Sequence, residues 1–526
     1  MAEEIVTLGQ SNLPMPVKTY ASAVYGIEAT TITIEVNISS GTKYFIVGLP
    51  DNAVKESMLR VEAAITTSGY RMPRQKIVVN LAPADIRKEG SAYDLAIAIG
   101  ILAASGQVES ALLEKYVILG EVSLDGGLQP VKGALPIAIQ ARKEGFEGVI
   151  IPTQNAREAA IVTGIAVYGV DNLKDVIAFF NKGEKPQVTV VDTREEFFNN
   201  INNYESDFSD VKGQENIKRA LEIAAAGGHN VILIGPPGSG KTMLAKRLPT
   251  ILPPLDLYEA LDTTKIHSVA GKLAASDSLM TVRPFRSPHH TISDVALVGG
   301  GANPQPGEIS LAHNGVLFLD ELPEFKRAVL EVMRQPLEER RITISRARFS
   351  VDYPASFMLI ASMNPCPCGF YNHPEKECMC GPGVVQKYLS RVSGPLLDRI
   401  DLHVEVTPVN FSELASERST EKSGVIRERV IKARDIQIKR FTDKPDVFSN
   451  AQMSPKTVRD ICLINEAGQM LLKKAMEKLG LSARAYDRIL KVARTIADLA
   501  ESEEIKIEHL AEAIHYRSLD REGWAG

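Results

Sequence analysis

The sequence has 526 residues, of which 44% are hydrophobic, and a formal net charge of −5. This length can bury several hydrophobic cores and predicts about three or four domains. The negative charge excludes a uniformly basic surface, so binding to DNA would require a local basic patch. The acidic start, Met1-Ala-Glu-Glu, is not typical of a signal peptide, and no apolar run reaches the roughly 18 residues of a membrane span. We therefore expect a cytoplasmic protein without membrane contact.

The first part of the chain, residues 1–185, alternates short strand-like stretches with helical stretches, which predicts an α/β domain. The expected strands include residues 31–36, 76–80 and 148–151, and the expected helices include residues 51–67 and 93–104. The polar stretch that follows predicts a linker over residues 186–209.

A glycine-rich loop follows the apolar run Val231 to Ile234 and matches the pattern G-x-x-x-x-G-K-[ST]. Its residues are Gly235, Pro236, Pro237, Gly238, Ser239, Gly240, Lys241 and Thr242. A strand before such a loop and a helix after it let backbone N–H groups surround phosphate oxygens at a helix N-terminus. We predict that the loop binds ATP, that Lys241 reaches the β- and γ-phosphates, and that Thr242 ligates Mg²⁺.

An inserted segment, residues 267–301, lies between the loop and the next strand. It contains Arg283, Phe285 and Arg286, which suit phosphate contact and base stacking and make it one candidate for DNA binding. The adjacent His289 and His290 could bind a metal. Side chains at neighbouring positions rarely point the same way. We therefore favour packing or loop hydrogen bonds over metal binding for these two histidines.

Two apolar runs end in residues that suit hydrolysis. Residues 315–321 predict a buried strand that ends in two carboxylates, of which Asp320 can hold Mg²⁺ and Glu321 can polarise the attacking water. Residues 357–362 predict another strand, and Asn364 follows it with an amide that can orient water near the γ-phosphate. The alternative, which stays open, is that Asp320, Glu321 and Asn364 only form ordinary turns at the ends of these strands.

Between these two runs, residues 340–349 alternate apolar and polar side chains, which predicts a β-hairpin with Arg346 and Arg348 at its tip. Arginines at a hairpin tip would bind DNA phosphates without reading the base sequence. A surface hairpin held by salt bridges is the alternative.

Four of the five cysteines are close in sequence, namely Cys366, Cys368, Cys378 and Cys380. Two close pairs of thiolates joined by a short loop can surround one Zn²⁺ tetrahedrally, so we predict a structural zinc. Reduced thiols and redox chemistry are the alternatives, and His373 inside the loop could replace one cysteine. Cys462 is isolated in a helical pattern and is expected in a core.

A candidate arginine finger follows a Gly-Pro turn. We expect Arg399 to project from its domain and to stabilise the charge of phosphoryl transfer at a neighbouring subunit's nucleotide. An internal salt bridge to Asp398 or Asp401 is the alternative.

Residues 409–526 place apolar side chains at helical spacing, which predicts a small helical lid. Arg484 opens one of its helices, where the nucleotide state could be sensed. Arg488 is the competing candidate for that role.

Several of these motifs together resemble the AAA+ ATPases related to the magnesium-chelatase I subunit. They are Asp210-Val-Lys-Gly-Gln214, the phosphate loop, residues 316–321, Asn364, residues 395–401 and residues 482–484. More narrowly, Phe285-Arg-Ser-Pro-His-His-Thr, residues 306–321 and Met363-Asn-Pro-Cys-Pro-Cys-Gly resemble the bacterial ComM (YifB) family over nearly the whole chain.

This resemblance implies an AAA+ P-loop α/β/α core over residues 210–408. It also implies a homo-hexameric ring that migrates branched DNA during natural transformation, with hairpins pointing into the pore. By position, Asn364 would be the first sensor, Arg399 the finger and Arg484 the second sensor.

The N-terminal domain resembles the Lon-type protease domain, of the ribosomal S5 domain 2 type, through Lys88-Glu-Gly-Ser-Ala-Tyr-Asp and residues 119–133. A Lon protease needs a serine nucleophile and a lysine base. The alignment places Ala92 and Leu135 at those positions, and a shifted dyad of Ser91 and Lys132 stays open. We expect a structural or DNA-binding domain.

The favoured function is therefore an ATP-driven motor that acts on single-stranded or branched DNA. The rival is a magnesium-chelatase-like ATPase that remodels a protein partner. Glu321 makes a non-enzymatic nucleotide-binding scaffold the least favoured interpretation.

Overall fold

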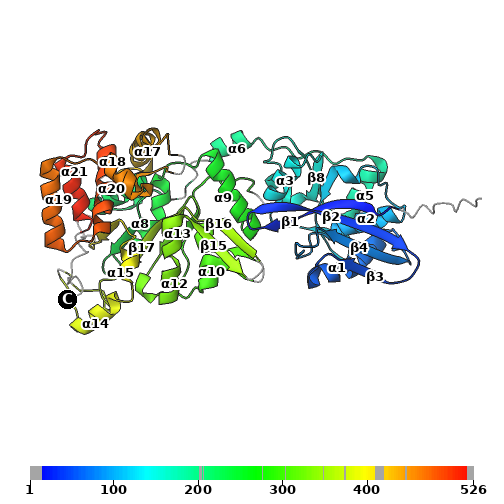
Figure 1. Ribbon diagram of the computed structural model, residues 1–526, viewed down its shortest axis with the longest axis horizontal. Coiled ribbons are helices and arrows are strands. Elements are labelled where there is room, and N and C mark those ends of the chain that lie inside the picture. Colours follow the sequence, from blue (N-terminus) through cyan, green and yellow to red (C-terminus); the bar gives the residue numbers. More distant parts are fainter. Residues whose placement is uncertain are drawn as a thin grey trace, which may run out of the picture. The chain divides into compact units, whose positions relative to one another are not determined.

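The computed structural model describes residues 15–200, 204, 206–274, 277–301, 304–346, 349–371, 373, 375–408, 420–444 and 447–517 (Figure 1). The chain divides into two compact units. The N-terminal unit contains Met1–Glu196 and also Thr264–Leu279, whereas the second unit contains Phe197–Thr263 and Met280–Gly526. The sequence assigned residues 264–279 to the expected ATPase core, but they group with the N-terminal unit. No helix among the described residues combines the length and the apolar character that crossing a bilayer requires.

The N-terminal unit is built on a seven-stranded mixed sheet in the order β3-β4-β2-β1-β5-β8-β9. In the second strand, Ile32, Ile34 and Val36 are fully buried, as the alternation of apolar side chains predicts for one face of a sheet. The strands are β1 (Val17–Tyr25), β2 (Glu28–Ser39), β3 (Tyr44–Val47), β4 (Lys76–Ala82), β5 (Tyr116–Ile118), β8 (Gly148–Pro152) and β9 (Ala166–Val170).

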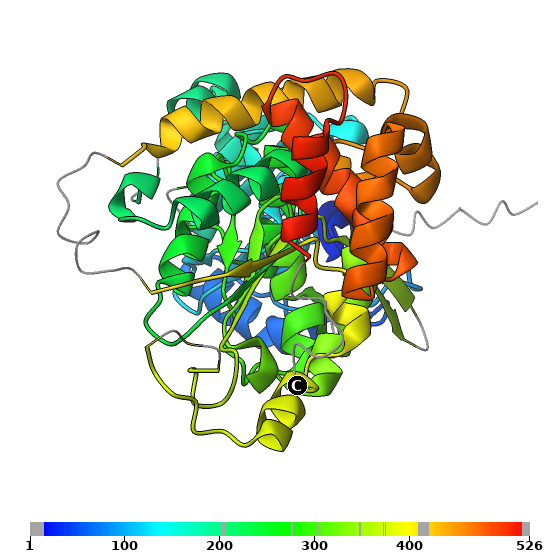
Figure 2. The ribbon, with the colours of Figure 1, turned by 90° about the vertical axis from the view of Figure 1, so that its left-hand side faces the viewer.

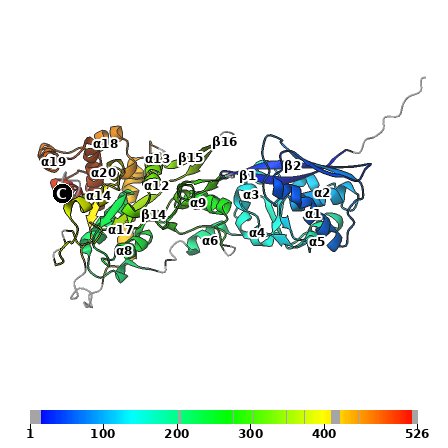
Figure 3. The same cartoon turned by 90° about the horizontal axis from the view of Figure 1, so that it is seen from below.

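Helices cover this sheet (Figure 1 and Figure 3). Helix α2 packs on β1 and β2 and is buried from Asp94 to Ala103, because its sequence is apolar on every face. These helices are α1 (Asn52–Thr67), α2 (Asp94–Ala104), α3 (Ala134–Lys143), α4 (Thr153–Ala159) and α5 (Leu173–Lys182), with a short hairpin of β6 (Glu121–Val122) and β7 (Leu128–Gln129). Helix α6 (Thr193–Asn200) begins in this unit and ends in the second.

The second unit contains a five-stranded sheet in the order β11-β14-β17-β10-β18, in which all neighbouring strands run parallel. The three central strands are buried along their whole length, as expected for a parallel sheet covered on both faces. The strands are β10 (Val231–Ile234), β11 (Phe285–Arg286), β14 (Val316–Leu319), β17 (Met358–Met363) and β18 (Leu402–Glu405).

Helices and smaller elements complete the part of this unit around the sheet. The helices are α7 (Glu215–Gly227), α8 (Lys241–Arg247), α9 (Leu257–Ala270), α10 (Asp294–Val298), α11 (Glu308–Leu311), α12 (Arg327–Val332), α13 (Arg334–Glu339), α14 (Pro382–Leu389) and α15 (Gly394–Leu397). Two hairpins are formed by β12 (Gly299–Gly300) with β13 (Gln305–Pro306) and by β15 (Arg341–Arg346) with β16 (Phe349–Pro354). Helix α9 crosses from the second unit into the N-terminal unit.

The C-terminal part, residues 420–517, is helical, as the sequence predicted, and appears in orange and red in Figure 2. It shares one apolar core with the parallel sheet, which joins Ala224 of α7, Val231 of β10 and Ile489 of α20. Its helices are α17 (Ser423–Arg440), α18 (Pro455–Ile461), α19 (Glu466–Leu479), α20 (Ala483–Leu499) and α21 (Ile507–His515).

A buried polar network fixes helix α20 against the sheet. The carboxylate of Asp401, which is 2% exposed, accepts a hydrogen bond from the guanidinium of Arg488 and lies 3.3 Å from Nδ1 of His229. Nε2 of His229 lies 2.8 Å from Oγ1 of Thr495. The positive charge of Arg488 holds the pKa of Asp401 below its ordinary value although burial acts in the opposite direction.

We predict that Asp401→Asn destabilises the second unit by about 3 kcal/mol, because it leaves Arg488 without its charged partner in a largely buried site. The urea unfolding midpoint, followed by circular dichroism, measures this loss. As a control, Lys432→Ala removes an exposed pair with Glu501 at 3.9 Å and should cost less than about 1 kcal/mol. Equal effects of the two variants would contradict a stabilising role of the network.

Candidate functional site

The glycine-rich loop for which the sequence predicts phosphate binding, called the phosphate loop, joins the end of β10 to the start of α8, as its sequence pattern predicted. Gly238 and Gly240 have φ values of 76° and 87°, in the left-handed region that favours glycine. A Cβ at Gly235 would lie 2.2 Å from the carbonyl oxygen of Val406, so a larger residue would displace the chain after β18. The loop therefore depends on its glycines both for its turns and for its packing.

Lys241 starts α8 and is buried beneath the loop. Its Nζ donates to the carbonyl oxygens of Gly235 and Pro236, both at 2.8 Å, and lies 3.2 Å from Oδ1 of Asn364. Burial lowers the pKa of Lys241. All three acceptors are neutral, so a charged phosphate oxygen would form a stronger hydrogen bond with the same ammonium group.

Asp320 lies at the end of β14, next to the helix start. Its Oδ2 accepts a hydrogen bond of 2.7 Å from Oγ1 of Thr242, and its Oδ1 accepts one from Oγ of Ser362. A hydroxyl and a carboxylate in contact are the hard oxygen donors that Mg²⁺ prefers beside nucleotide phosphates. The donor set therefore fits a magnesium ion held by Thr242 and Asp320.

Glu321 has a strained backbone. Its φ and ψ are 54° and 50°, in the left-handed region, which costs a residue with a side chain of the order of 1–2 kcal/mol. Such strain is concentrated at functional sites. The side chain of Glu321 is 57% exposed, and its Oε2 lies 3.4 Å from Nδ1 of His290. Glu321 is thus accessible to water at the edge of the site.

Sequence reasoning missed two polar contacts in this site. Ser362 supports Asp320, and its place two residues before Asn364 was the available signal, because alternate strand residues share a face. Gln214 donates from Nε2 to the carbonyl oxygen of Ser239 at 2.9 Å and so braces the phosphate loop. In the sequence, Gln214 stands out only as the last residue of the motif Asp210-Val-Lys-Gly-Gln214.

Arg399 does not project from the domain as expected. It is 7% exposed, and its guanidinium contacts Oε1 of Glu338 at 2.5 Å and donates to the carbonyl oxygen of Pro395 at 2.5 Å. The internal salt bridge that was the alternative does form, but with neither of the two expected aspartates. The sequence could not name this partner, because Glu338 is distant in sequence and meets Arg399 only in the folded unit.

The two candidate arginines of the helical segment differ in their surroundings. The side chain of Arg488 is 21% exposed and is bound to the buried Asp401. The side chain of Arg484 is 66% exposed and lies 3.6 Å from Asp398. Arg488 is therefore occupied in holding the fold together, whereas Arg484 is accessible to a ligand.

The structure brings the four clustered cysteines together. Their sulfur atoms all lie within 4.8 Å of one another, and those of Cys366 and Cys378 are 3.7 Å apart. Tetrahedral zinc with thiolate ligands requires sulfur–sulfur distances of roughly 3.8 Å. Nδ1 of His373 instead accepts hydrogen bonds from the amides of Glu375 and Lys376 at 3.0 and 3.1 Å. The cysteines alone thus fit a zinc ion, and His373 shapes the loop between them.

The cysteine segment packs against the phosphate loop. A Cβ at Gly369, whose φ is 84°, would lie 2.4 Å from Cδ of Pro237. The turn that carries Cys366 and Cys368 is therefore in close contact with the loop that would bind nucleotide. Cys462 is 4% exposed in the apolar core, as its helical setting predicted.

The predicted hairpin is present as β15 and β16, with Arg346 paired to Phe349 at the end of the ladder. Ile342, Ile344 and Val351 are buried on one face, while Thr343 on the other face donates to Asp352 at 2.5 Å. Arg348 lies outside the described residues, and the side chain of Arg346 is not described. The backbone places Arg346 at the tip end of the hairpin.

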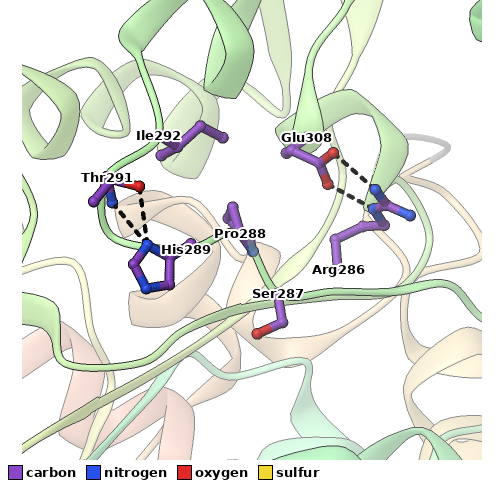
Figure 4. A pocket seen from close by; sticks show the side chains of 7 residues that line it. All are labelled: Arg286, Ser287, Pro288, His289, Thr291, Ile292 and Glu308. Atoms are coloured by element: carbon purple, nitrogen blue, oxygen red, sulfur yellow. Dashed lines mark hydrogen bonds and ion pairs between the residues drawn. The ribbon is translucent and has the colours of Figure 1, made fainter.

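The inserted segment is less suited to DNA than its composition suggested. Arg283 donates to the carbonyl oxygens of Pro253 and Asn314 at 2.6 and 2.7 Å, and Arg286 forms a bidentate pair with Glu308 at 2.6 and 2.7 Å (Figure 4). Both guanidinium groups are thus used within the fold, which weakens this DNA candidate.

An open hollow of about 320 Å³ lies beside this segment. It is lined by Arg286, Ser287, Pro288, His289, Thr291, Ile292 and Glu308, as Figure 4 shows. His289 makes a loop hydrogen bond of 2.9 Å with Oγ1 of Thr291, in keeping with the interpretation favoured from the sequence.

The N-terminal unit does not assemble the shifted dyad at Ser91. The hydroxyl of Ser91 donates to the carboxylate of Glu121, while the side chain of Lys132 lies against Gly271. Leu135, at the position of the lysine base, is fully buried. The serine is therefore paired with an acid rather than with a base.

Comparisons with known proteins agree with these motifs. Residues 207–414 match the family described as magnesium chelatase, subunit ChlI, and residues 420–517 match its C-terminal family. Residues 34–155 match the family described as subunit ChlI of Mg-chelatase.

Individual relatives extend this likeness to almost the whole chain. The chain is 45% identical to the competence protein ComM of Haemophilus influenzae over 505 residues, which are 95% of this chain and 97% of that protein. It is 45% identical to YifB of Escherichia coli over 508 residues, again 95% and 97% of the two chains. A shorter stretch of 189 residues, 30% of this chain and 33% of the relative, is 30% identical to Lon protease 2 of Bacillus subtilis.

Proposed function

The chain belongs to the ComM and YifB family of magnesium-chelatase-like AAA+ ATPases, and from this premise we propose that it is an ATP-hydrolysing ring motor that acts on DNA. The observation that carries the proposal is the joint position of Lys241, Thr242, Asp320 and Glu321 at one edge of the parallel sheet. The likeness to a competence protein supports a role connected with DNA, and the family resemblance implies branch migration as the activity.

In this proposal the N-terminus of α8 and its loop bind the phosphates of ATP, with Lys241 at the β- and γ-phosphates. Thr242 and Asp320 would hold Mg²⁺, which neutralises charge that develops on the phosphate oxygens. The contact between Thr242 and Asp320 supports these assignments.

Glu321 accepts a hydrogen bond from the attacking water and increases its nucleophilicity toward the γ-phosphorus. The oxygen of the water forms a bond to the γ-phosphorus while the bond between the γ-phosphorus and the β–γ bridging oxygen breaks. ADP leaves with the electron pair of the broken bond, and the proton of the water passes to Glu321. Asn364 is bound to Lys241 through Oδ1, so its amide nitrogen can orient the same water. The exposure of the Glu321 carboxylate supports this role.

We expect Glu321→Gln to lower the turnover of ATP by about 100-fold or more, because an amide cannot accept the water's proton. Binding of ATP should be retained, since Lys241 and the loop are unchanged. Phosphate release measures turnover, and a fluorescent ATP analogue measures binding. The neighbouring Glu324→Gln, which alters a surface pair with Arg391, should leave turnover near the parent rate. Undiminished turnover in Glu321→Gln would refute the catalytic assignment.

The proposed ring is a homo-hexamer that hydrolyses ATP between neighbouring subunits. Arg399 would be the finger and the exposed Arg484 the second sensor, as the family resemblance implies. Because Arg399 is bound to Glu338 in this chain, its guanidinium would have to leave that carboxylate to reach a neighbour's nucleotide. Ring formation therefore implies a change of partner for Arg399.

The β15–β16 hairpin would bind DNA. Arg346 ends the ladder of a hairpin that buries Ile342, Ile344 and Val351 on one face. Together with Arg348, which the sequence predicts at the tip, it would give a pore loop the positive charge that binds phosphates. The N-terminal unit would be a structural or DNA-binding domain, because the hydroxyl of Ser91 is paired with the carboxylate of Glu121 rather than with Lys132. We propose a cytoplasmic location for such a motor.

Single-stranded and branched DNA should stimulate ATP turnover of the parent protein. Arg346→Ala with Arg348→Ala should remove that stimulation, because the phosphate contacts at the tip are lost. Arg341→Ala removes an arginine from the base of the same hairpin and should keep the stimulation. A parent protein that does not respond to DNA would contradict the DNA motor and favour a motor that remodels proteins.

We also propose that one zinc ion is bound by four cysteines, namely Cys366, Cys368, Cys378 and Cys380. A bound zinc ion would hold the two cysteine pairs together through four thiolates. Because Gly369 packs on Pro237, the zinc site would also fix one side of the phosphate loop.

We predict that Cys378→Ser with Cys380→Ser lowers the zinc content from about one equivalent per chain to near zero. The same variant should bind ATP about three- to tenfold more weakly, because the phosphate loop loses support, at a cost of about 1 kcal/mol. Elemental analysis and titration with a fluorescent ATP analogue measure the two effects. Cys462→Ala is the control and should retain its zinc. Parent protein without zinc would refute the metal site, and unchanged affinity would refute the support of the loop.

A further inference from the structure

The helices on the seven-stranded sheet of the N-terminal unit leave part of one face open. Ile77, Val79 and Leu81 of β4 are fully buried on the covered face, in a core to which α1 and α2 contribute. Lys76 and Asn80, at the alternate positions of the same strand, are only partly buried. The open part of the sheet can receive a flat ligand, because its side chains project in regular rows.

Three strands form this open face, and their pairing sets its rows of side chains (Figure 1). The edge strand β3 pairs in parallel with β4, so Phe45 lies beside Val78. Strand β4 pairs antiparallel with β2, so Val78 also lies beside Asn37, and Lys76 lies beside Ser39. Residues paired in this way project from the same face. Two neighbouring rows thus carry an aromatic ring, a lysine, an amide and a hydroxyl.

The ring of Phe45 is exposed on this face. Phe45 is 44% exposed, and Val47, two residues later on the same face, is exposed as well. Nζ of Lys76 lies 5.5 Å from the centroid of the Phe45 ring. A ring with a cation beside it matches the two parts of a nucleotide, since the ring can stack on the base and the cation can contact a phosphate.

The chain around this face is basic, although the whole sequence has a net charge of −5. Residues 36–50 and 63–84 include β3, β4 and the end of β2 and contain no aspartate or glutamate. Their basic residues are Lys43, Arg71, Arg74 and Lys76. The first three are exposed, and none of the four forms an ion pair with another described residue. This is the local basic patch that an acidic protein needs in order to bind DNA.

The groups on this face suit a single strand of DNA better than a duplex. A duplex hides the flat faces of its bases, whereas an unpaired base can stack on an aromatic ring whatever its identity. Asn37 and Ser39 are exposed and can form hydrogen bonds with the edges of unpaired bases. Glu35 lies on the same face, two rows from Lys76, and accepts a hydrogen bond of 2.9 Å from Asn80. Its charge would direct the phosphates toward the basic end of the face.

We propose that the open face of β2, β3 and β4 is a second DNA site, which binds single-stranded DNA. Phe45 stacks on a base, and Lys43, Arg74 and Lys76 contact phosphates. The inference rests on the proposed function, because it takes DNA as the substrate of the motor. It gives the N-terminal unit a binding site of its own, apart from the β15–β16 hairpin.

The test measures binding of a fluorescein-labelled oligodeoxythymidine to the full-length protein by anisotropy, at several salt concentrations. Every variant also carries Arg346→Ala with Arg348→Ala, so that binding by the hairpin is removed, and this double variant is the reference. Phe45→Ala should weaken binding by about fivefold or more, because the stacking of one base is lost. The salt dependence should stay as in the reference, and Phe45→Trp should retain the reference affinity.

Lys43→Ala with Arg74→Ala should change the salt dependence instead. Loss of two phosphate contacts should reduce the slope of log affinity against log salt by about 1.4, since each contact with a single strand contributes about 0.7. Thermal unfolding midpoints equal to that of the reference would show that the fold is intact. A slope that stays at the reference value would overturn the phosphate contacts.

Lys55→Ala with Leu59→Ala is the matched control. Both residues are exposed on α1, whose buried side chains pack in the core on the covered face of the sheet. Affinity and salt slope should therefore equal those of the reference. Binding of a blunt duplex should not respond to Phe45→Ala. An equal loss in the control, or an equal loss of duplex binding in Phe45→Ala, would overturn the site.

Failure of the inference can be distinguished from failure of the proposed function. If DNA stimulates the parent but Phe45→Ala binds the oligonucleotide as the reference does, the motor stands and this face is not a DNA site. If Phe45→Ala changes only the number of subunits, measured by light scattering, the face is a contact between copies and the DNA site is overturned. If the parent itself binds no DNA, the proposed DNA motor fails together with this site.

Discussion

Parallel pairing of the central strands is the constraint on which the candidate site depends. Ile234 of β10 lies beside Met363 of β17, and Leu319 of β14 lies beside Ala361, so all three strands end at one edge of the sheet. The phosphate loop, Asp320 and Asn364 are the residues that follow these ends. A one-residue slip of β17 would turn Ser362 to the opposite face and remove the hydroxyl that supports Asp320. The placement of the candidate site residues thus follows from strand register rather than from the loop alone.

A second constraint joins the helical segment to this sheet. Asp401 directly precedes β18 and receives Arg488 and His229, while Thr495 of α20 completes the chain of hydrogen bonds. Buried charges are costly unless they are paired, so these residues define one arrangement of α20 on the sheet. Arg484 lies near the start of the same helix, so this network also fixes where the helix that carries Arg484 lies relative to the sheet.

Local sequence was sufficient for elements whose residues are consecutive. The phosphate loop, the buried strand before Asp320, the β15–β16 hairpin and the helical C-terminal segment all have short-range patterns, and the structure contains them. The four cysteines lie together in the structure because they are also close in sequence. Contacts between distant segments were not predictable in this way. The partner of Arg399 is Glu338, and that of Glu321 is His290; both pairs form only because separate strands and helices end side by side.

Helix α9 begins a stretch of the chain that belongs to the N-terminal unit although the residues before and after it belong to the second unit. Residues 264–279 leave the second unit and return to it, and within the N-terminal unit Ser268 donates to Glu158, while the amide of Gly133 donates to the carbonyl oxygen of Ser268 at 3.3 Å. A fragment that began at residue 197 would retain residues 264–279 but would lack the part of the N-terminal unit with which they pack, including Glu158 and Gly133. Dissecting the protein into independently folding pieces would therefore require replacing residues 264–279 by a short bridge, rather than simply cutting the chain once.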